Sequence, residues 1–175
     1  MNENKSILPE CYVDSCLIEV LLHAGRDYVN HQKGNGTVAK KMQAEFNNDF
    51  CVGIIDEDRR PLDYLKEFDL KKSSESLKLW KHKMKHHYFI QVCPVIEKLI
   101  RHECEERNIN LLEFDLPVGL KELTKLSKSI SSKNDPRFIA LFKTMIHKHC
   151  DSILELQKWI EYLRREKYEA DINEL

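Results

Sequence analysis

The stretch "GIIDEDRRP", residues 53–61, constrains the fold of this chain more than any other. Apolar residues that favour a strand run directly into Asp56, Glu57 and Asp58, and two arginines follow. Carboxylates buried without partners would be very costly, so the run has to deliver them to an edge where water, a metal ion or cationic groups meet them. The stretch therefore predicts a buried strand that ends at a polar edge.

Short apolar runs alternate with helix-length amphipathic segments over residues 11–110, which is typical of strand, crossover helix, strand units. We predict an α/β fold with a mostly parallel sheet flanked by helices. Helices are expected between Asp14 and Gly25, from Gly36 or Thr37 through Phe46, and from Pro94 to about Arg107. The expected strands are residues 10–13, 27–31, 50–55, 77–81 and 87–93, and the Lys- and Ser-rich stretch 59–76 is read as a polar connection.

The chain changes character beyond Pro117, where apolar residues recur with helical spacing in three segments. We therefore divide it into an α/β domain, residues 1–116, and a helical extension, residues 117–175. The apolar stripes of the extension are compatible with a face for a partner. Because such stripes usually face the chain's own core, we expect the extension to cap the sheet.

Composition and charge describe an ordinary globular protein of 175 residues, 42% of them apolar, with a net charge of −1. This charge argues against a protein that is basic all over, although a local basic patch can still bind nucleic acid. The amino terminus lacks the apolar region of a signal peptide, and no apolar run approaches the roughly 20 residues needed to span a bilayer. We expect a cytoplasmic protein without a membrane partner, whose six isolated cysteines are reduced core residues.

Carboxylates from two strands are expected to meet at one edge of the sheet. All strands of a parallel sheet point the same way, so Asp14, at the end of the first expected strand, emerges beside Asp56 and Asp58. Asp56 and Asp58 are two residues apart and point alike, whereas Glu57 faces the other way. Magnesium prefers such oxygen ligands and keeps several of its waters.

Two further acids are candidates for the same edge. Glu19 lies five residues after Asp14, and Glu97 lies near the start of the helix that Pro94 is expected to open. Each candidate has a structural alternative. A helix amino terminus favours Glu97 electrostatically without any ligand, and the Asp56 and Asp58 pair taken alone is also typical of a solvated turn.

The motifs "CYVDSCLIEVLL" and "CVGIIDED" together resemble those of the TOPRIM domain, over roughly residues 10–110. The first motif of that family is a strand ending in Glu, then Gly, then a helix with another acid; here Asp14, Ser15 and Glu19 take those places. Its second motif ends in two aspartates, which match Asp56 and Asp58. "HHYFIQVCPVIEKLI" is similar to the family's strand and Glu-bearing helix, and "VNHQKGNGTVAKKM" to its Gly-rich connection.

The resemblance implies a Rossmann-like TOPRIM fold and a nuclease that cleaves RNA or DNA phosphodiesters with Mg²⁺ or Mn²⁺. It places Asp56, Asp58, Asp14 and Glu97 on the metal and Asp14, Glu19, Asp56 and Asp58 in catalysis. It also implies a role as an anti-phage defence effector with an ATPase partner. The altered first motif and the helical extension favour an alternative, a catalytically inactive module that binds a partner ATPase or nucleic acid.

A basic segment offers a surface for nucleic acid. Residues 71–87 hold six lysines and one glutamate, a local net charge of +5. The candidate binding residues are Arg59, Arg60, Lys81, Lys83, Lys85, His86 and His87, with the histidines expected to stack on bases. The alternative is a solvated hairpin whose lysines discourage aggregation. The motif "HKHC", residues 147–150, matches no common zinc spacing.

Overall fold

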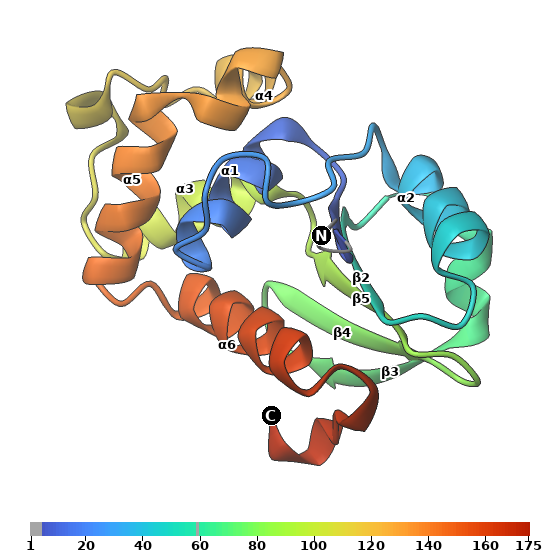
Figure 1. The fold of residues 1–175 in the computed structure, drawn as a ribbon. Coiled ribbons are helices and arrows are strands. Elements are labelled where there is room, and N and C mark those ends of the chain that lie inside the picture. Colours follow the sequence, from blue (N-terminus) through green and yellow to red (C-terminus); the bar gives the residue numbers. More distant parts are fainter. Residues whose placement is uncertain (1–4, 59) are drawn as a thin grey trace.

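Five strands form one mixed sheet at the centre of the molecule (Figure 1). A computed structural model describes residues 5–58 and 60–175. The strands are β1 (Ile7–Pro9), β2 (Cys51–Asp56), β3 (Phe68–Ser73), β4 (Leu77–His82) and β5 (His87–Val92), in the spatial order β1-β2-β5-β4-β3. β1, β2 and β5 are parallel, whereas β4 runs antiparallel to β5 and β3 antiparallel to β4. The α/β class is confirmed, and the sheet is parallel in one half only.

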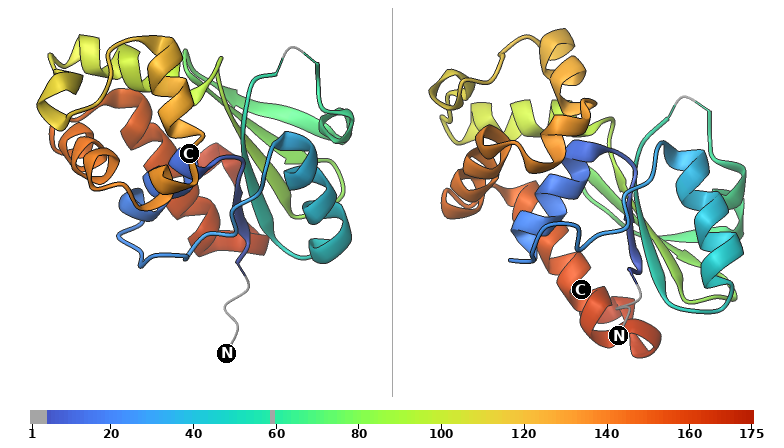
Figure 2. Two further views of the ribbon diagram at one scale, coloured as in Figure 1. Left: turned by 90° about the horizontal axis from the view of Figure 1, so that it is seen from above. Right: turned by 45° about the horizontal axis from the view of Figure 1, so that its top comes forward.

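Helices cover both faces of this sheet (Figures 1 and 2). α2 (Asn35–Lys41), which continues into a π-helical turn at Met42–Phe46, covers one face. The other face carries α1 (Tyr12–Leu21), α3 (Ile96–Glu106) and α6 (Asp151–Glu166). α5 (Pro136–His147) packs on α1 from the outside, and α4 (Leu120–Ser127) lies beside α3. Single 3₁₀ segments lie at Asp63–Glu67, Leu111–Phe114, Ile130–Asn134, Lys167–Glu169 and Ile172–Glu174.

Alternate residues of β2 feed two separate cores, as the period of a strand requires. Val52 and Ile54 belong to the large cluster under α1 and α3, whereas Cys51 and Ile55 belong to the smaller cluster under α2. A Cβ on Gly53 would lie 2.6 Å from the Phe89 ring and 2.8 Å from Val38, so a side chain does not fit there. The strand is therefore covered closely on both faces, and its acidic end is delivered to the rim.

The helical extension shares the larger core. Leu123, Phe142 and Trp159 lie in the same buried cluster as Leu17 of α1 and Ile90 of β5. The extension thus packs on the chain's own α/β part, with α6 alongside the sheet (Figure 1). None of the described helices is both long and apolar enough to cross a membrane.

The first strand lies earlier than expected. Residues 10–13 were expected to form it, but the strand is Ile7–Pro9, and α1 begins at Tyr12. Pro9 obscured this strand because proline interrupts most sheet ladders. Directly after β1, the N–H of Glu10 donates to the carbonyl of Ile54 in β2. Because successive backbone nitrogens of a strand point in opposite directions, the nitrogen of Pro9 faces away from β2, and no hydrogen bond between the two strands is lost.

Two other expectations fail in the connections. Residues 27–31 form no regular strand, although Asn30 and Gln32 donate backbone hydrogen bonds to β1, each of 2.9 Å. The polar stretch 59–76 contains β3, the outermost strand of the sheet. Its exposed, Lys-rich sequence is typical of a protected edge and hides the apolar alternation. Pro94 precedes α3 by two residues instead of opening it.

Candidate functional site

The carboxyl ends of the three parallel strands meet at one rim of the sheet. Glu10 follows β1, Asp56 ends β2, and Val92 of β5 pairs with Asp56 just before the chain turns into α3. Asp14 lies in the first turn of α1 and Glu97 in the first turn of α3. We call this group, made of Glu10, Asp14, Asp56, Asp58 and Glu97, the acidic rim.

Glu10 and Asp56 are tied together through the backbone. Oε2 of Glu10 accepts a 2.9 Å hydrogen bond from the N–H of Asp56. Oδ1 of Asp56 in turn accepts a 3.0 Å bond from the N–H of Ile96, one of the free donors at the start of α3. The Asp56 carboxylate therefore fixes α3 against the end of β2, and this orientation does not depend on a flexible loop.

Asp14 is the most enclosed member of the rim. Its side chain is 3% exposed, and Oδ2 accepts a 3.2 Å hydrogen bond from the N–H of Cys11. Oδ1 is buried and has no hydrogen-bond partner. A buried acceptor left unpaired costs on the order of 1–3 kcal/mol, and more when it is charged. The structure thus contains a buried carboxylate oxygen that accepts no hydrogen bond from the residues that it describes.

The rim raises the pKa of its own acids. Burial is the main cause that raises the pKa of Asp14 and of Asp56, and Coulombic repulsion adds to it. Asp14, Glu10 and Glu97 each raise the pKa of Asp56, so these carboxylates lie close enough to repel one another. Burial also raises the pKa of Glu10, although the Asp56 N–H and the charge of Lys128 lower it. The convergence expected of Asp14 and Asp56 is present, with Glu10 as an additional member.

Asp58 and Glu57 diverge after the strand. Glu57 turns away to an ion pair with Lys78, 2.5 Å from Nζ to Oε1, in agreement with its expected opposite direction. Asp58 is exposed and accepts a 3.4 Å hydrogen bond from Asn35. It contributes to the raised pKa of Glu10, so it lies at the outer part of the acidic rim.

Glu19 is not at the rim. Its Oε1 accepts a 3.3 Å hydrogen bond from the N–H of Val29, and Glu19 borders a separate cavity of about 340 Å³ between α1 and α5. Five residues of helix place it well round from Asp14, because residues three or four apart share a face. Its expected catalytic role is therefore not supported by its position.

The donor set of the rim fits a hard divalent cation in chemistry. Glu10, Asp14, Asp56 and Glu97 present carboxylate oxygens, and a backbone N–H or a serine hydroxyl holds each of them. Within residues 5–58 and 60–175, however, no three or more His, Cys, Asp or Glu side chains form a ready-made metal-binding group. A cation would have to draw these carboxylates closer together than they stand.

The lysines expected to bind nucleic acid lie at the opposite rim. Leu77 of β4 pairs with Val92, whereas Lys81 pairs with Tyr88 at the other end of β5. Five residues of strand separate Val92 from His87, which is roughly 17 Å. We call the surface of Lys71, Lys72, Lys81, Lys83 and Lys85 the basic rim.

The histidines of this hairpin do not offer free ring faces. His87 is 0% exposed, and its Nδ1 lies 2.7 Å from the hydroxyl of Tyr64, so its expected stacking on a base is wrong. Burial is the main cause that lowers the pKa of His87 to about 4. His86 packs edge-on against Tyr168. Arg60 is exposed beyond Asp58, and Arg59 lies outside the described residues.

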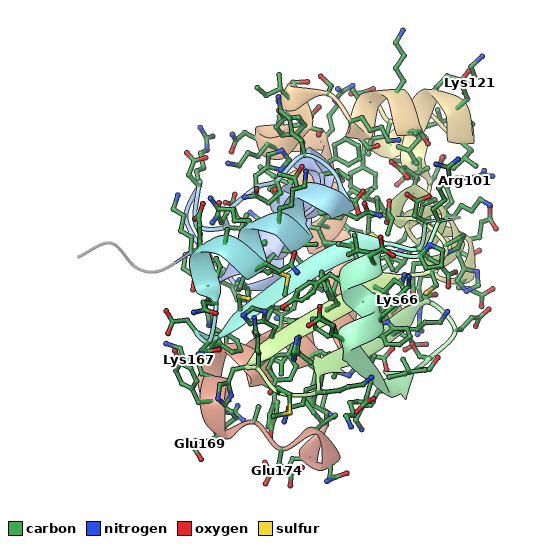
Figure 3. The ribbon with its side chains drawn as sticks, turned by 90° about the vertical axis from the view of Figure 1, so that its right-hand side faces the viewer. Lys66, Arg101, Lys121, Lys167, Glu169 and Glu174 are labelled. Atoms are coloured by element: carbon green, nitrogen blue, oxygen red, sulfur yellow. The ribbon has the colours of Figure 1, made fainter. Side chains whose placement is uncertain are left out.

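The basic rim borders a cavity of about 460 Å³ on the C-terminal segment. Lys71, Lys72, Lys81 and Lys83 line it together with Asp69 and residues 170–173, which include Asp171. Figure 3 shows the C-terminal segment, labelled at Glu169 and Glu174, at the end of the molecule opposite Lys121 of α4. The basic rim and the acidic rim therefore lie at different ends of the fold.

The cysteines and the "HKHC" motif fit the structural interpretation. All six cysteines are free, and four of them are buried. Cys150 is 0% exposed, with Sγ 4.0 Å from the carbonyl of Glu103. In the part of the chain that the structure describes, no metal-binding group includes the histidines.

Two residues of the site were missed in the sequence. Glu10 follows the short run "ILP", an edge strand whose three residues, one of them a proline, carry too weak a strand signal. Ser127, which donates a hydrogen bond to Glu97, lies in the helical extension, and no sequence pattern connects it to the rim.

Comparison with protein-family models, curated proteins and solved structures finds no match to this chain.

Proposed function

We propose that this protein is a nuclease of TOPRIM type that cleaves RNA or DNA phosphodiesters at the acidic rim with Mg²⁺ or Mn²⁺. The observation that carries the proposal is the carboxylate of Asp14. It is buried beside Glu10, Asp56 and Glu97, and one of its oxygens has no partner. A divalent cation would satisfy that oxygen and offset the repulsion among the acids.

The corrected start of α1 supports the resemblance to the TOPRIM motifs. Glu10 directly follows the first strand, Cys11 stands where the family has Gly, and Asp14 is the acid on the following helix. The carboxylate at the strand end is then the expected Glu, and only the glycine differs. The first acid of the motif is then Glu10, which has the side-chain length of the family's Glu, and not the shorter Asp14.

The chain's own groups have separable roles in this proposal. Asp14 and Asp56 would hold the cation directly, with Glu10 and Glu97 as further oxygen donors. Bound there, the cation would supply charge for the scissile phosphate and a more acidic water. Asp58, at the outer part of the rim, would meet the nucleophile or a bound water. Arg60 and Lys128 would supply positive charge for the substrate backbone.

A defence role and an ATPase partner are part of the proposal through the resemblance alone. The second candidate function is a catalytically inactive module that binds a partner ATPase or nucleic acid. One observation favours it: the described residues hold no ready-made metal group. Such a module would bind its partner or nucleic acid through the basic rim and would not require a metal at the acidic rim.

A cleavage assay separates the two functions. The protein is incubated with labelled tRNA, single-stranded DNA and plasmid, in Mg²⁺, in Mn²⁺ and in EDTA. We expect cleavage of at least one substrate with metal and none in EDTA. Asp56→Asn keeps Oδ1 for the Ile96 N–H but removes the charge, so it should lower the rate by at least a hundredfold.

The matched control is Asp69→Asn, an exposed carboxylate on β3 at the other end of the sheet. It should cleave like the parent protein. Equal loss in both variants, cleavage in EDTA, or no cleavage of any substrate would contradict the nuclease proposal and favour the binding module.

A further inference from the structure

A buried serine links the helical extension to the acidic rim. Ser127 is the last residue of α4 and is 0% exposed. Its hydroxyl donates to Oε1 of Glu97 on α3, with the carbonyl of Thr124, 3.0 Å away, as a second acceptor. The contact joins residues that are 30 positions apart, across the boundary between the α/β part and the extension.

The chain beyond α4 is fixed by a second buried serine. The hydroxyl of Ser132 lies 2.6 Å from the carbonyl of Ser127 and 2.7 Å from that of Ser129, and it donates to these backbone atoms. Ser132 therefore holds the backbone that follows α4, whereas Ser127 holds a carboxylate. The two serines are equally buried and differ in what they contact.

The end of α4 also reaches the rim through charge. Lys128, directly after Ser127, is exposed, and its ammonium lowers the pKa of Glu10. Glu97 itself is 3% exposed and contributes to the raised pKa of both Asp14 and Asp56. The end of α4 thus contacts one member of the acidic rim, Glu97, and acts on a second, Glu10, through charge.

Glu97 needs such a contact if it is to act as a ligand of a cation. A long carboxylate side chain has rotational freedom, and a hydrogen bond from a fixed donor selects one orientation. The buried Oδ1 of Asp14, which has no hydrogen-bond partner among the described residues, is an independent observation that points to a ligand at these acids. Fixing Glu97 near Asp14 holds a second carboxylate close to that oxygen.

We infer that Ser127 is a positioning residue, which holds the Glu97 carboxylate toward the cation shared with Asp14 and Asp56. The helical extension is then a part of the site, because α4 supplies this contact. The inference rests on the proposed function, since it requires that the acidic rim binds a divalent cation. Residues 117–175 cap the sheet and also complete its acidic edge.

The test compares Mn²⁺ affinity in the full chain, by isothermal titration calorimetry, for the parent protein, Ser127→Ala and Ser132→Ala. Loss of a group that orients a metal ligand typically weakens metal affinity 10- to 100-fold. We expect Ser127→Ala to raise the Mn²⁺ dissociation constant at least tenfold. Ser132→Ala removes an equally buried hydroxyl that contacts backbone only, so it should leave the constant within about twofold.

Ser127→Cys, which is close in size and a weak donor, replaces Ser127→Ala if the alanine variant does not fold. The double variant Ser127→Ala/Glu97→Gln should bind Mn²⁺ no more weakly than Glu97→Gln alone, because the hydroxyl acts through Glu97. If the parent binds Mn²⁺ and both serine variants bind it equally, the inference is wrong and the metal site stands. If the parent itself binds no Mn²⁺, the proposed function and the inference both fail.

Discussion

The two rims of the sheet are opposite in charge and differ in how that charge is satisfied. At the acidic rim, Asp14 and Glu97 are buried and Asp56 is partly enclosed, and Glu97 raises the pKa of both aspartates. At the basic rim the lysines stand in or near solvent. The enclosed histidines there are satisfied in part: Nδ1 of His87 lies against the Tyr64 hydroxyl while its Nε2 is unpartnered, and His82 accepts from two backbone N–H groups. The basic rim therefore presents its charge to solvent, whereas the acidic rim encloses carboxylates beside one another.

The difference between the rims helps to separate functional charges from structural ones. The Lys-rich segment attracts attention in the sequence because six lysines are obvious, but exposed lysines on an edge hairpin are also what protects a sheet from aggregation. Buried like charges have no comparable structural use. They persist where a ligand offsets them, which is why perturbed acids mark candidate sites.

The largest expected contrast is in stability without metal. In EDTA at pH 8, Asp56 of the folded parent protein is either ionised among the other acids or protonated well above its ordinary pKa, and both states cost free energy. Asp56→Asn removes this cost and keeps the acceptor for Ile96, so we expect stabilisation of about 1–3 kcal/mol. Lys83→Gln at the basic rim should change the free energy of unfolding by less than about 0.5 kcal/mol. Urea unfolding followed by circular dichroism measures both. Equal effects at the two rims would remove the distinction between them.

Metal should stabilise the parent protein but not Asp56→Asn. An ion at one hundred times its dissociation constant stabilises the folded state by about 2.7 kcal/mol. For a chain of this size this corresponds to a rise in melting temperature of roughly 5–10 °C. We expect the rise in the parent protein and in Lys83→Gln, and none in Asp56→Asn. A full rise in Asp56→Asn, measured by differential scanning calorimetry with Mn²⁺, would place the metal elsewhere.

The pH dependence of the free energy of unfolding should have opposite signs for the acids of the acidic rim and for His87 beside the basic rim. The folded pKa of Asp14 and of Asp56 is raised, so above about pH 4 the folded state binds more protons than the unfolded state, and stability falls as pH rises. The folded pKa of His87 is lowered to about 4, so its contribution to stability is lost as pH falls from about 6.5 toward 4.

Above about pH 7.5 the unfolded-state histidine is largely neutral, and the falling slope belongs to the acidic rim. Burial, with repulsion from neighbouring acids, raises the pKa of Asp14 to about 7 and that of Asp56 to about 9, so Asp56 carries most of the slope above pH 7.5. Asp56→Asn should therefore flatten this slope in EDTA. Free energies of unfolding at half-unit pH intervals test this. A slope that stays the same in Asp56→Asn would mean that Asp56 is ionised throughout.

The smallest expected effect concerns nucleic acid at the basic rim. Replacing Lys81, Lys83 and Lys85 with Gln removes up to three phosphate contacts, and each contact contributes about 0.7 to the salt slope of single-strand binding. We expect the slope for a labelled single strand, measured by fluorescence anisotropy, to fall by about 2. Mn²⁺ affinity should not change. An unchanged slope would leave the hairpin lysines with a protective role alone.

The central part of the fold is predictable because its signals are local. The run before Asp56 is apolar, fully buried and ends in acids, so β2 and its rim position follow from pattern alone. β4, β5, α3 and the three helices of the extension have equally clear periodicity. Strand β1 has three residues and a proline, and β3 is exposed and charged, so both depend on pairing partners that no local pattern reveals.

The site was predictable in part for the same reason. Asp56, Asp58 and Glu97 follow or precede well-marked elements, and the structure brings Asp14 to them from α1. Glu10 was missed because its strand was missed, and Glu19 was included because the first motif was placed four residues late. Ser127 reaches Glu97 only through the packing of α4 on α3, which is a property of tertiary structure.

Direct binding of Mn²⁺ to the acidic rim tests the account most simply. Calorimetric titration at pH 7.5 in two buffers of different ionisation enthalpy gives the stoichiometry, the affinity and the number of protons released. We expect the parent protein to bind Mn²⁺ saturably with release of protons, and we expect Asp14→Asn and Asp56→Asn to lose both. Absence of binding at millimolar Mn²⁺, or undiminished binding in both variants, would contradict it.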